Sequence, residues 1–313
     1  MPDTAARCTY LWLLLLLALA APGSAGEQGK VSVVFAGDVM LDGGPGHAIA
    51  NGKDPFADLA KIFASADAAV CNLECVIAEG GKRVQKPYNF QGHPECIPIL
   101  KRHFSAVCVA NNHSGDYGRE ALREQCDLLD KAGLPYFGGG RDRKEAHRPL
   151  ILTANGRRIA LLGYNRFPPR AFKAAEDRPG VAWLKESKVV EDIRAARKQQ
   201  RADIVIPCLH WGREMEIAPT DERKQLARHL IDAGADAVIG GHPHVTQTVD
   251  MYRGKPIVYS LGNCVFDYFP VDPPVWTGWV VRLTFRASGG VELETFAVEL
   301  DPAGIPHVVP RKE

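Results

Sequence analysis

The sequence lacks a strong net charge, internal repeats, low-complexity runs and, beyond its first residues, any long apolar segment. Its 38 basic and 37 acidic residues give a net charge of +1. This balance argues against general binding to nucleic acids or membrane surfaces, so no nucleic-acid partner is expected. A membrane helix needs roughly 20 apolar residues, and no stretch after the N-terminal one is long enough to be a second membrane segment.

The first residues have the order of a secretory signal peptide. Arg7 precedes an apolar run from Leu11 to Ala21, and Pro22-Gly23 and small residues follow it. We predict that residues 1–25 are a signal peptide, cleaved near Ala25 or Gly26. The mature chain is then periplasmic or secreted. The alternative is an uncleaved N-terminal segment that anchors the protein in the membrane.

The cysteines limit the disulfides that are expected. Removal of Cys8 leaves seven, and an odd number in an oxidising compartment leaves at least one thiol unpaired. Cys71 and Cys75 are the candidates for pairing. The other cysteines considered lie inside apolar runs, where a buried cysteine acts as a small hydrophobic residue: Cys108, Cys208 and Cys264.

Residues 27–313 have the length of a single α/β domain. Short apolar runs predict buried strands at Val31–Ala36, Ala68–Cys71, Ala106–Ala110, Ile159–Gly163, Ile204–Leu209 and Ala237–Ile239. Apolar residues at helical spacing predict helices at Pro55–Ser65, Arg119–Ala132 and Asp221–Ala233, the last two ending at Gly133 and Gly234. Alternating strands and helices indicate parallel pairing, with ligands bound at the carboxyl ends of the strands.

Two further patterns interrupt this alternation and predict a second sheet. Asn155-Gly156 and Arg253-Gly254 lie between apolar runs and are typical hairpin turns, and Gly289-Gly290 separates two strands near the C-terminus. We therefore predict a two-sheet α/β sandwich flanked by helices. The polar stretch from Phe167 to Pro179 is predicted to be a loop over one rim.

Five polar clusters follow apolar runs and together predict a split metal site. They contain carboxylate, amide and imidazole groups, which are ligands of hydrolytic divalent metals. The clusters are Gly37-Asp38, Asn72-Leu73-Glu74, Asn111-Asn112-His113, His210-Trp211-Gly212 and Gly241-His242-Pro243-His244.

Each cluster also has a simpler explanation. Asp38 is in a position to cap a helix or form a turn, Asn112 and His113 to cap the helix near Gly118, and Glu74 to pair with a surface lysine. The two imidazoles of His242 and His244, separated by a proline, are harder to explain without a metal. One shared site accounts for all the clusters together.

The order of these motifs resembles that of the bacterial capsule-synthesis family called CapA, which is associated with poly-γ-glutamate. The resemblance runs from about Val31 to Asp267. It rests on the five clusters and on Asp116-Tyr117-Gly118, Glu214, Lys86-Pro87-Tyr88-Asn89-Phe90 and Tyr259-Ser260-Leu261-Gly262-Asn263.

The CapA family is similar in turn to the calcineurin-like metallophosphoesterases, which implies a metallophosphoesterase-like sandwich with two metals at the strand ends. The resemblance places Asp38 and His244 on one metal and Glu74 between both. It places Asn112, His210 and His242 on the other metal, and His113 beside the site, facing a leaving oxygen. Asn112 and His113 are the residues whose loss should abolish catalysis.

The sequence departs from the phosphoesterase pattern at two positions. Met40 stands where that pattern has a histidine, and Glu74 replaces the usual bridging aspartate. The first metal is therefore expected to bind more weakly, unless Asp42 or His47 compensates. The ligand set suits two divalent ions of manganese, iron or zinc alike.

Two divalent metals activate water for hydrolysis, so a phosphoester or a bond in an anionic polymer is the expected substrate. Arg83 and Lys86, with Lys82, are candidates for receiving such an anion, although a basic loop is often merely solvated. A membrane-bound capsule-synthesis complex is the expected partner. The alternative function is a non-catalytic accessory that binds the polymer during synthesis or export. A closed structural metal site is disfavoured, because such zinc sites prefer cysteine.

Overall fold

The structure is a computed structural model that describes residues 29–267 and 273–310. The predicted signal peptide lies outside the described residues and stays a prediction. Across the described ranges, no helix combines the length and apolarity that crossing a membrane requires.

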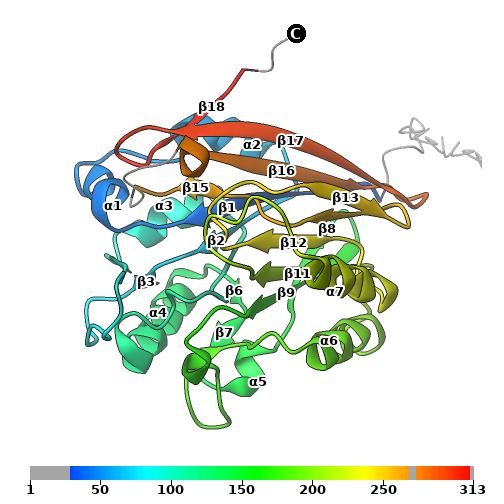
Figure 1. Ribbon diagram of the computed structural model, residues 1–313, viewed down its shortest axis with the longest axis horizontal. Helices are drawn as coiled ribbons and strands as arrows, with labels where there is room; N and C mark the ends of the chain where they lie inside the picture. The colour runs from blue at the N-terminus through cyan, green and yellow to red at the C-terminus, as the bar shows by residue number, and fades with distance from the viewer. Residues whose placement is uncertain (1–28, 268–272, 311–313) are drawn as a thin grey trace, which may run out of the picture.

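Two mixed sheets form the centre of the domain (Figure 1). The first has eight strands, in the order β18 (Pro306–Val308), β17 (Val291–Leu300), β16 (Thr277–Phe285), β1 (Val31–Val39), β2 (Ala68–Leu73), β5 (Ala106–Cys108) and β6 (Tyr136–Phe137), with β15 (Asn263–Val265) also paired to β1. The second has six, in the order β13 (Val249–Tyr252), β14 (Lys255–Val258), β12 (Val238–Gly241), β11 (Ile204–His210), β9 (Arg157–Asn165) and β8 (Leu150–Ala154). The predicted two-sheet α/β sandwich is confirmed.

In the first sheet β1, β2, β5 and β6 are parallel and β16, β17 and β18 are antiparallel, whereas the second sheet has parallel strands in its middle and an antiparallel hairpin at each edge. The predicted turns at Asn155-Gly156, Arg253-Gly254 and Gly289-Gly290 connect β8 to β9, β13 to β14 and β16 to β17. Two short pairs lie outside the main sheets: β3 (Val76–Ile77) with β4 (Gln91–Gly92), and β7 (Gly139–Gly140) with β10 (Gly180–Val181).

Helices cover the outer faces of the two sheets (Figure 1). The α-helices are α1 (Gly43–Ala50), α2 (Ala60–Ala64), α3 (Cys96–His103), α4 (Gly118–Ala132), α5 (Arg143–Ala146), α6 (Glu186–Lys198) and α7 (Asp221–Asp232). The 3₁₀ helices are η1 (Ala57–Leu59), η2 (Arg170–Phe172) and η3 (Pro273–Trp276). The helix predicted at Pro55–Ser65 is therefore two short pieces, η1 and α2. The stretch from Phe167 to Pro179 is a loop, as predicted, except for η2.

The alternation of side chains along the strands produces three apolar layers. In β1, Val33 and Phe35 belong to the core between the sheets, whereas Val34 belongs to the core shared with α3 and α4. In β11, Ile204 and Ile206 face the first sheet, and Val205 belongs to the core under α6 and α7. Both sheets are thus buried on both faces in their central strands, which fixes the carboxyl ends of those strands relative to one another.

The cysteines are all buried and unpaired from Cys71 to Cys264, so the proposed Cys71–Cys75 disulfide is wrong. Cys71 lies within β2, and Cys75 lies in a bend two residues beyond the end of that strand. Both thiols contribute to the apolar core instead.

A buried carboxylate, Asp192, ties α6 to β9. It accepts a hydrogen bond from the Tyr164 hydroxyl (2.9 Å) and lies 3.0 Å from both His147 Nδ1 and Lys188 Nζ. Burial alone would raise the pKa of Asp192, but the contacts with His147, Lys188 and Tyr164 outweigh it and the pKa is lowered.

Replacing Asp192 by Asn should lower the free energy of unfolding by about 1–3 kcal/mol at neutral pH, because it weakens a buried charged hydrogen-bond network. Since the folded pKa of Asp192 lies below its ordinary value, this stabilisation is present above that value and is lost as the pH falls through the folded pKa. Urea unfolding at several pH values measures both effects. Glu191→Gln on the exposed side of α6 is the control and should change stability by less than about 0.5 kcal/mol; equal effects of the two variants would contradict this account.

Candidate metal centre

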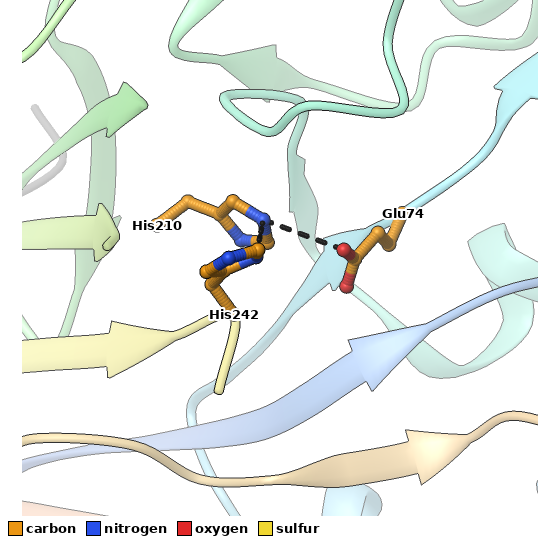
Figure 2. A group of neighbouring side chains, drawn as sticks. All are labelled: Glu74, His210 and His242. Atoms are coloured by element: carbon orange, nitrogen blue, oxygen red, sulfur yellow. Dashed lines mark hydrogen bonds and ion pairs between the residues drawn. The ribbon is translucent and has the colours of Figure 1, made fainter. Parts of the chain in front are cut away.

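The predicted clusters meet at the carboxyl ends of strands from both sheets. Asp38 lies near the end of β1, at an irregularity where its neighbours across the sheet are Asn72 on β2 and Asn263 on β15. Glu74 directly follows β2, and His210 is the last residue of β11. Figure 2 shows His210, at the end of β11, pointing toward Glu74, with the ring of His242, which follows β12 (Val238–Gly241), next to it.

The side chains form two groups that share one carboxylate. Asp38, Glu74 and His244 form the first group, and Glu74, His210 and His242 form the second, with ligand atoms within 4.8 Å of one another in each. Asn112 adds its Oδ1 to the second group, 2.6 Å from His210 Nε2. The structure thus brings together the residues of the two predicted ligand sets, with Glu74 common to both, and their role as metal ligands stays a prediction.

The spacing of the second group suits a metal ion better than a hydrogen-bond network. His210 Nε2 lies 2.6 Å from Asn112 Oδ1, 3.0 Å from His242 Nδ1 and 3.3 Å from Glu74 Oε1. One ring nitrogen makes one hydrogen bond in the plane of the ring, as donor or as acceptor, and cannot satisfy three neighbours at once. Ligand atoms that each lie about 2.1 Å from one ion are about 3.0–3.4 Å from one another. The distances around His210 Nε2 are close to this spacing.

Two buried atoms at the centre have no hydrogen-bond partner within the described part of the chain: Glu74 Oε1 and His242 Nε2. Glu74 and His242 are fully buried. A buried polar atom without a partner is costly, so such atoms are expected where something else binds. The donor set and these two atoms therefore fit divalent metal ions.

The buried groups have strongly shifted pKa values in the protein alone. Burial raises the pKa of Glu74 well above its ordinary value, and the nearby Asp38 raises it further. Burial also raises the pKa of Asp38, against the opposing effect of His244. Burial, with the neighbouring imidazoles, lowers the pKa of both His210 and His242 well below the ordinary value. A cation would offset the cost of the two carboxylate charges, and neutral imidazoles are ready to act as ligands.

The backbone around the two histidines is unusual for residues with side chains. His242 and His244 have φ of +96° and +58°, in the left-handed region that is costly for residues other than glycine. A Cβ atom on Gly241 would meet Asp38 Oδ1 at 2.8 Å. A glycine therefore allows the second sheet to approach Asp38, and the strained turn aims both imidazoles at the carboxylates.

The simpler explanations for the clusters are wrong. Glu74 and Asp38 are fully buried, so neither is a surface or capping group. The N-cap of α4 is Tyr117, with no side-chain cap, because Asn112 and His113 lie too far upstream and turn toward the centre.

The two residues expected to compensate for Met40 have other places. Asp42 caps α1 and also accepts a hydrogen bond from Gln91 N, and His47 is an exposed residue of that helix. Neither belongs to any group of possible metal ligands found in the described ranges.

Residues 32–268 match the family described as Bacterial capsule synthesis protein PGA_cap. The chain belongs to this family. The predicted family resemblance is therefore confirmed.

Two relatives of the PGA_cap chain illustrate the similarity. "PGA biosynthesis protein CapA" of Bacillus subtilis (strain 168) is 33% identical over 247 residues, which cover 76% of this chain and 63% of that protein. "Capsule biosynthesis protein CapA" of Bacillus anthracis is 32% identical over 257 residues, covering 79% and 62%. This chain thus spans less than two-thirds of the length of these relatives.

Among solved structures, NAD nucleotidase of Haemophilus influenzae superposes with a TM-score of 0.49 and 14% sequence identity. The superposition covers 90% of this chain and 54% of that one.

His113 stands beside the second ligand group. It is buried, its Nδ1 lies 2.7 Å from Asp116 Oδ2, and its ring packs against Phe90. Burial lowers the pKa of His113 to about 4, despite the opposing effect of Asp116. His113 and Asn112 line a cavity of about 610 Å³ beside the metal centre. This volume is typical of pockets that bind small molecules or segments of a polymer.

Lys86 and Arg83, predicted to bind an anion, lie in different surroundings. Lys86 lines the same cavity, but its ammonium group forms an ion pair with Asp116 and donates to Asn112 O (2.9 Å). Arg83 is exposed and is not part of the cavity wall. The contacts of Lys86 indicate that it holds Asp116 and the Asn112–His113 turn in place, and anion binding by either residue stays a prediction.

Three asparagines support the ligands, and sequence reasoning gave none of them a role. Asn72 Nδ2 donates to Asp38 Oδ1 (2.8 Å), and Asn111 Nδ2 donates to Asn72 Oδ1 (3.0 Å). Asn263 Oδ1 lies 2.9 Å from His244 Nδ1, which leaves His244 Nε2 directed at Glu74. Such outer contacts fix the orientation of metal ligands. The family motifs contained all three residues, but only the fold shows which ligand each one contacts.

Proposed function

We propose that this chain is a periplasmic or secreted metal-dependent hydrolase of capsule or poly-γ-glutamate synthesis, acting on a phosphoester or on a bond of an anionic polymer. The observation that carries the proposal is the crowding of Asn112 Oδ1, His242 Nδ1 and Glu74 Oε1 around His210 Nε2. Family membership and the name of the Bacillus anthracis relative support the capsule context, and the name of the Bacillus subtilis relative, a PGA biosynthesis protein, supports poly-γ-glutamate as the polymer.

Each residue has a proposed place in the reaction. Asp38 and His244 would hold one ion, Asn112, His210 and His242 the other, and Glu74 both. A pair of divalent ions, of manganese, iron or zinc, would supply activated water and neutralise charge on the attacked centre. Asp116 accepts from His113 Nδ1, so Nε2 of the neutral ring is left as an acceptor; it would take up the proton that the attacking water releases and pass it to the leaving oxygen. The cavity beside His113 would receive the leaving group.

A second function is favoured by one specific observation. Met40 is fully buried, and its sulfur accepts from Asp42 N (3.1 Å), so no imidazole stands at this position to strengthen the first ligand group. A weakened first ion is compatible with a non-catalytic accessory that uses the centre to hold an anionic polymer within a membrane-bound synthesis complex.

Hydrolysis of an aryl phosphodiester with added Mn²⁺ distinguishes the two functions. The hydrolase proposal predicts turnover that requires the metal and is lost in Asp38→Ala and His242→Ala. Polymer binding without turnover, in protein that contains metal, would favour the accessory role.

A further inference from the structure

Glu214 lies on the open side of the metal centre and has no role in the ligand set described above. It is an exposed residue of the loop that follows β11. A carboxylate oxygen of Glu214 and a ring nitrogen of each of His242 and His244 lie within 4.8 Å of one another. Glu214 therefore lies close to one histidine of each ligand group.

A second observation indicates that this side of the centre takes a ligand. His242 Nε2 is buried and has no hydrogen-bond partner within the described residues. Glu214 also lines the 610 Å³ cavity together with Asn112 and His113. The carboxylate thus stands at the boundary between the metal centre and the cavity through which a substrate would approach.

We infer that Glu214 supplies a third carboxylate to the metal centre and that the centre consequently prefers a substrate group with a single negative charge. This inference rests on the proposed dinuclear site. Ligating imidazoles are neutral, so Asp38, Glu74 and Glu214 together leave one net positive charge on a pair of divalent ions. A phosphodiester or a polymer bond with one adjacent carboxylate matches that charge. A phosphomonoester with two negative charges does not.

The hydrogen-bonding groups of the two cations of the cavity are used within the protein. The ammonium group of Lys86 is paired with Asp116. The guanidinium of Arg119 donates to the carbonyl oxygens of Ala171 (2.6 Å) and Pro179 and lies over the Phe172 ring. Both side chains are committed to contacts within the protein. Phe167 and Phe172 add apolar surface to the wall, so the leaving-group side of the substrate is expected to be uncharged.

Calorimetric titration of the full chain and of Glu214→Gln with Mn²⁺ tests the inference without relying on turnover. We expect Glu214→Gln to lower the affinity for the more weakly held ion by about tenfold or more. The loss of even an outer-shell partner weakens metal sites by that factor. In the presence of saturating Mn²⁺, inorganic phosphate at pH 8 should bind about tenfold or more tightly to Glu214→Gln, since a nearby like charge has been removed. Dimethyl phosphate, with one charge, should gain less.

The matched control is Glu299→Gln, which removes the same charge from an exposed position on β17 and should change neither titration. Unchanged Mn²⁺ affinity in Glu214→Gln would overturn the inference while leaving the dinuclear site intact. Equal gains for phosphate and dimethyl phosphate would overturn the charge preference. A wild-type chain that binds no Mn²⁺ would overturn the proposed function itself, and this inference with it.

Discussion

Replacing Glu74 by Gln should remove both metal ions while leaving the domain folded. Glu74 is the one carboxylate that belongs to both ligand groups, and its Oε1 lies 3.3 Å from His210 Nε2 and 3.8 Å from His244 Nε2. The affinity for each ion should fall more than about a hundredfold, since removal of outer-shell partners alone costs 10–100-fold. Elemental analysis after dialysis, together with Mn²⁺ titration, measures the loss.

Folding should survive this change for a physical reason. The buried Glu74 carboxylate is disfavoured in the metal-free protein, and its pKa is raised well above the ordinary value by burial and by Asp38. A neutral amide of the same shape avoids that cost, so the metal-free free energy of unfolding should be no lower than in the wild type. Glu299→Gln is the charge-matched control. Retention of two ions by Glu74→Gln would show that Glu74 is not the shared ligand.

Replacing His113 by Ala should lower turnover by about 10²–10⁴-fold without loss of metal, because general acid or base groups contribute catalysis of that size. His113 is absent from the three metal-ligand groups found in the described ranges, yet it lines the cavity beside them. Its Nδ1 is held by Asp116, which orients the ring toward the cavity. Steady-state kinetics with an aryl phosphodiester, paired with metal analysis of the same sample, separates the two effects.

The comparison variant is His93→Ala, an imidazole that is 59% exposed. It should leave both turnover and metal content unchanged. Asn112→Ala should instead lower both, because Asn112 Oδ1 lies within the second ligand group. Normal turnover by His113→Ala would remove His113 from the mechanism, and loss of metal from that variant would make it a ligand.

The central strands were predictable from the sequence because each is a short apolar run, whereas their order within the sheets was not predicted. The runs at Val31, Ala68 and Ile204 became β1, β2 and β11, and the glycine-containing turns became the edge hairpins. The helix α6 (Glu186–Lys198) was not identified, although its sequence spacing was available. The helix near Pro55 was predicted too long, since local spacing does not show where a 3₁₀ turn will replace an α-helix.

The ligands of the metal centre were predictable as residue types at strand ends, but their supporting contacts were not. Asn263 lies opposite Asp38 only because β15 pairs with β1. These two strands are more than 200 residues apart in the sequence. Lys86 was predicted to face solvent and an anion, whereas its ammonium group is paired with the buried Asp116. The direction of a side chain in a loop depends on tertiary contacts that sequence spacing does not encode.

Anomalous X-ray diffraction from crystals of the Mn²⁺-loaded protein tests the central claim most directly. Two peaks on either side of the Glu74 carboxylate are predicted, one near Asp38 and His244 and the other near Asn112, His210 and His242. The absence of any peak in this region, or a single peak that does not contact Glu74, would contradict a dinuclear centre built on these strand ends.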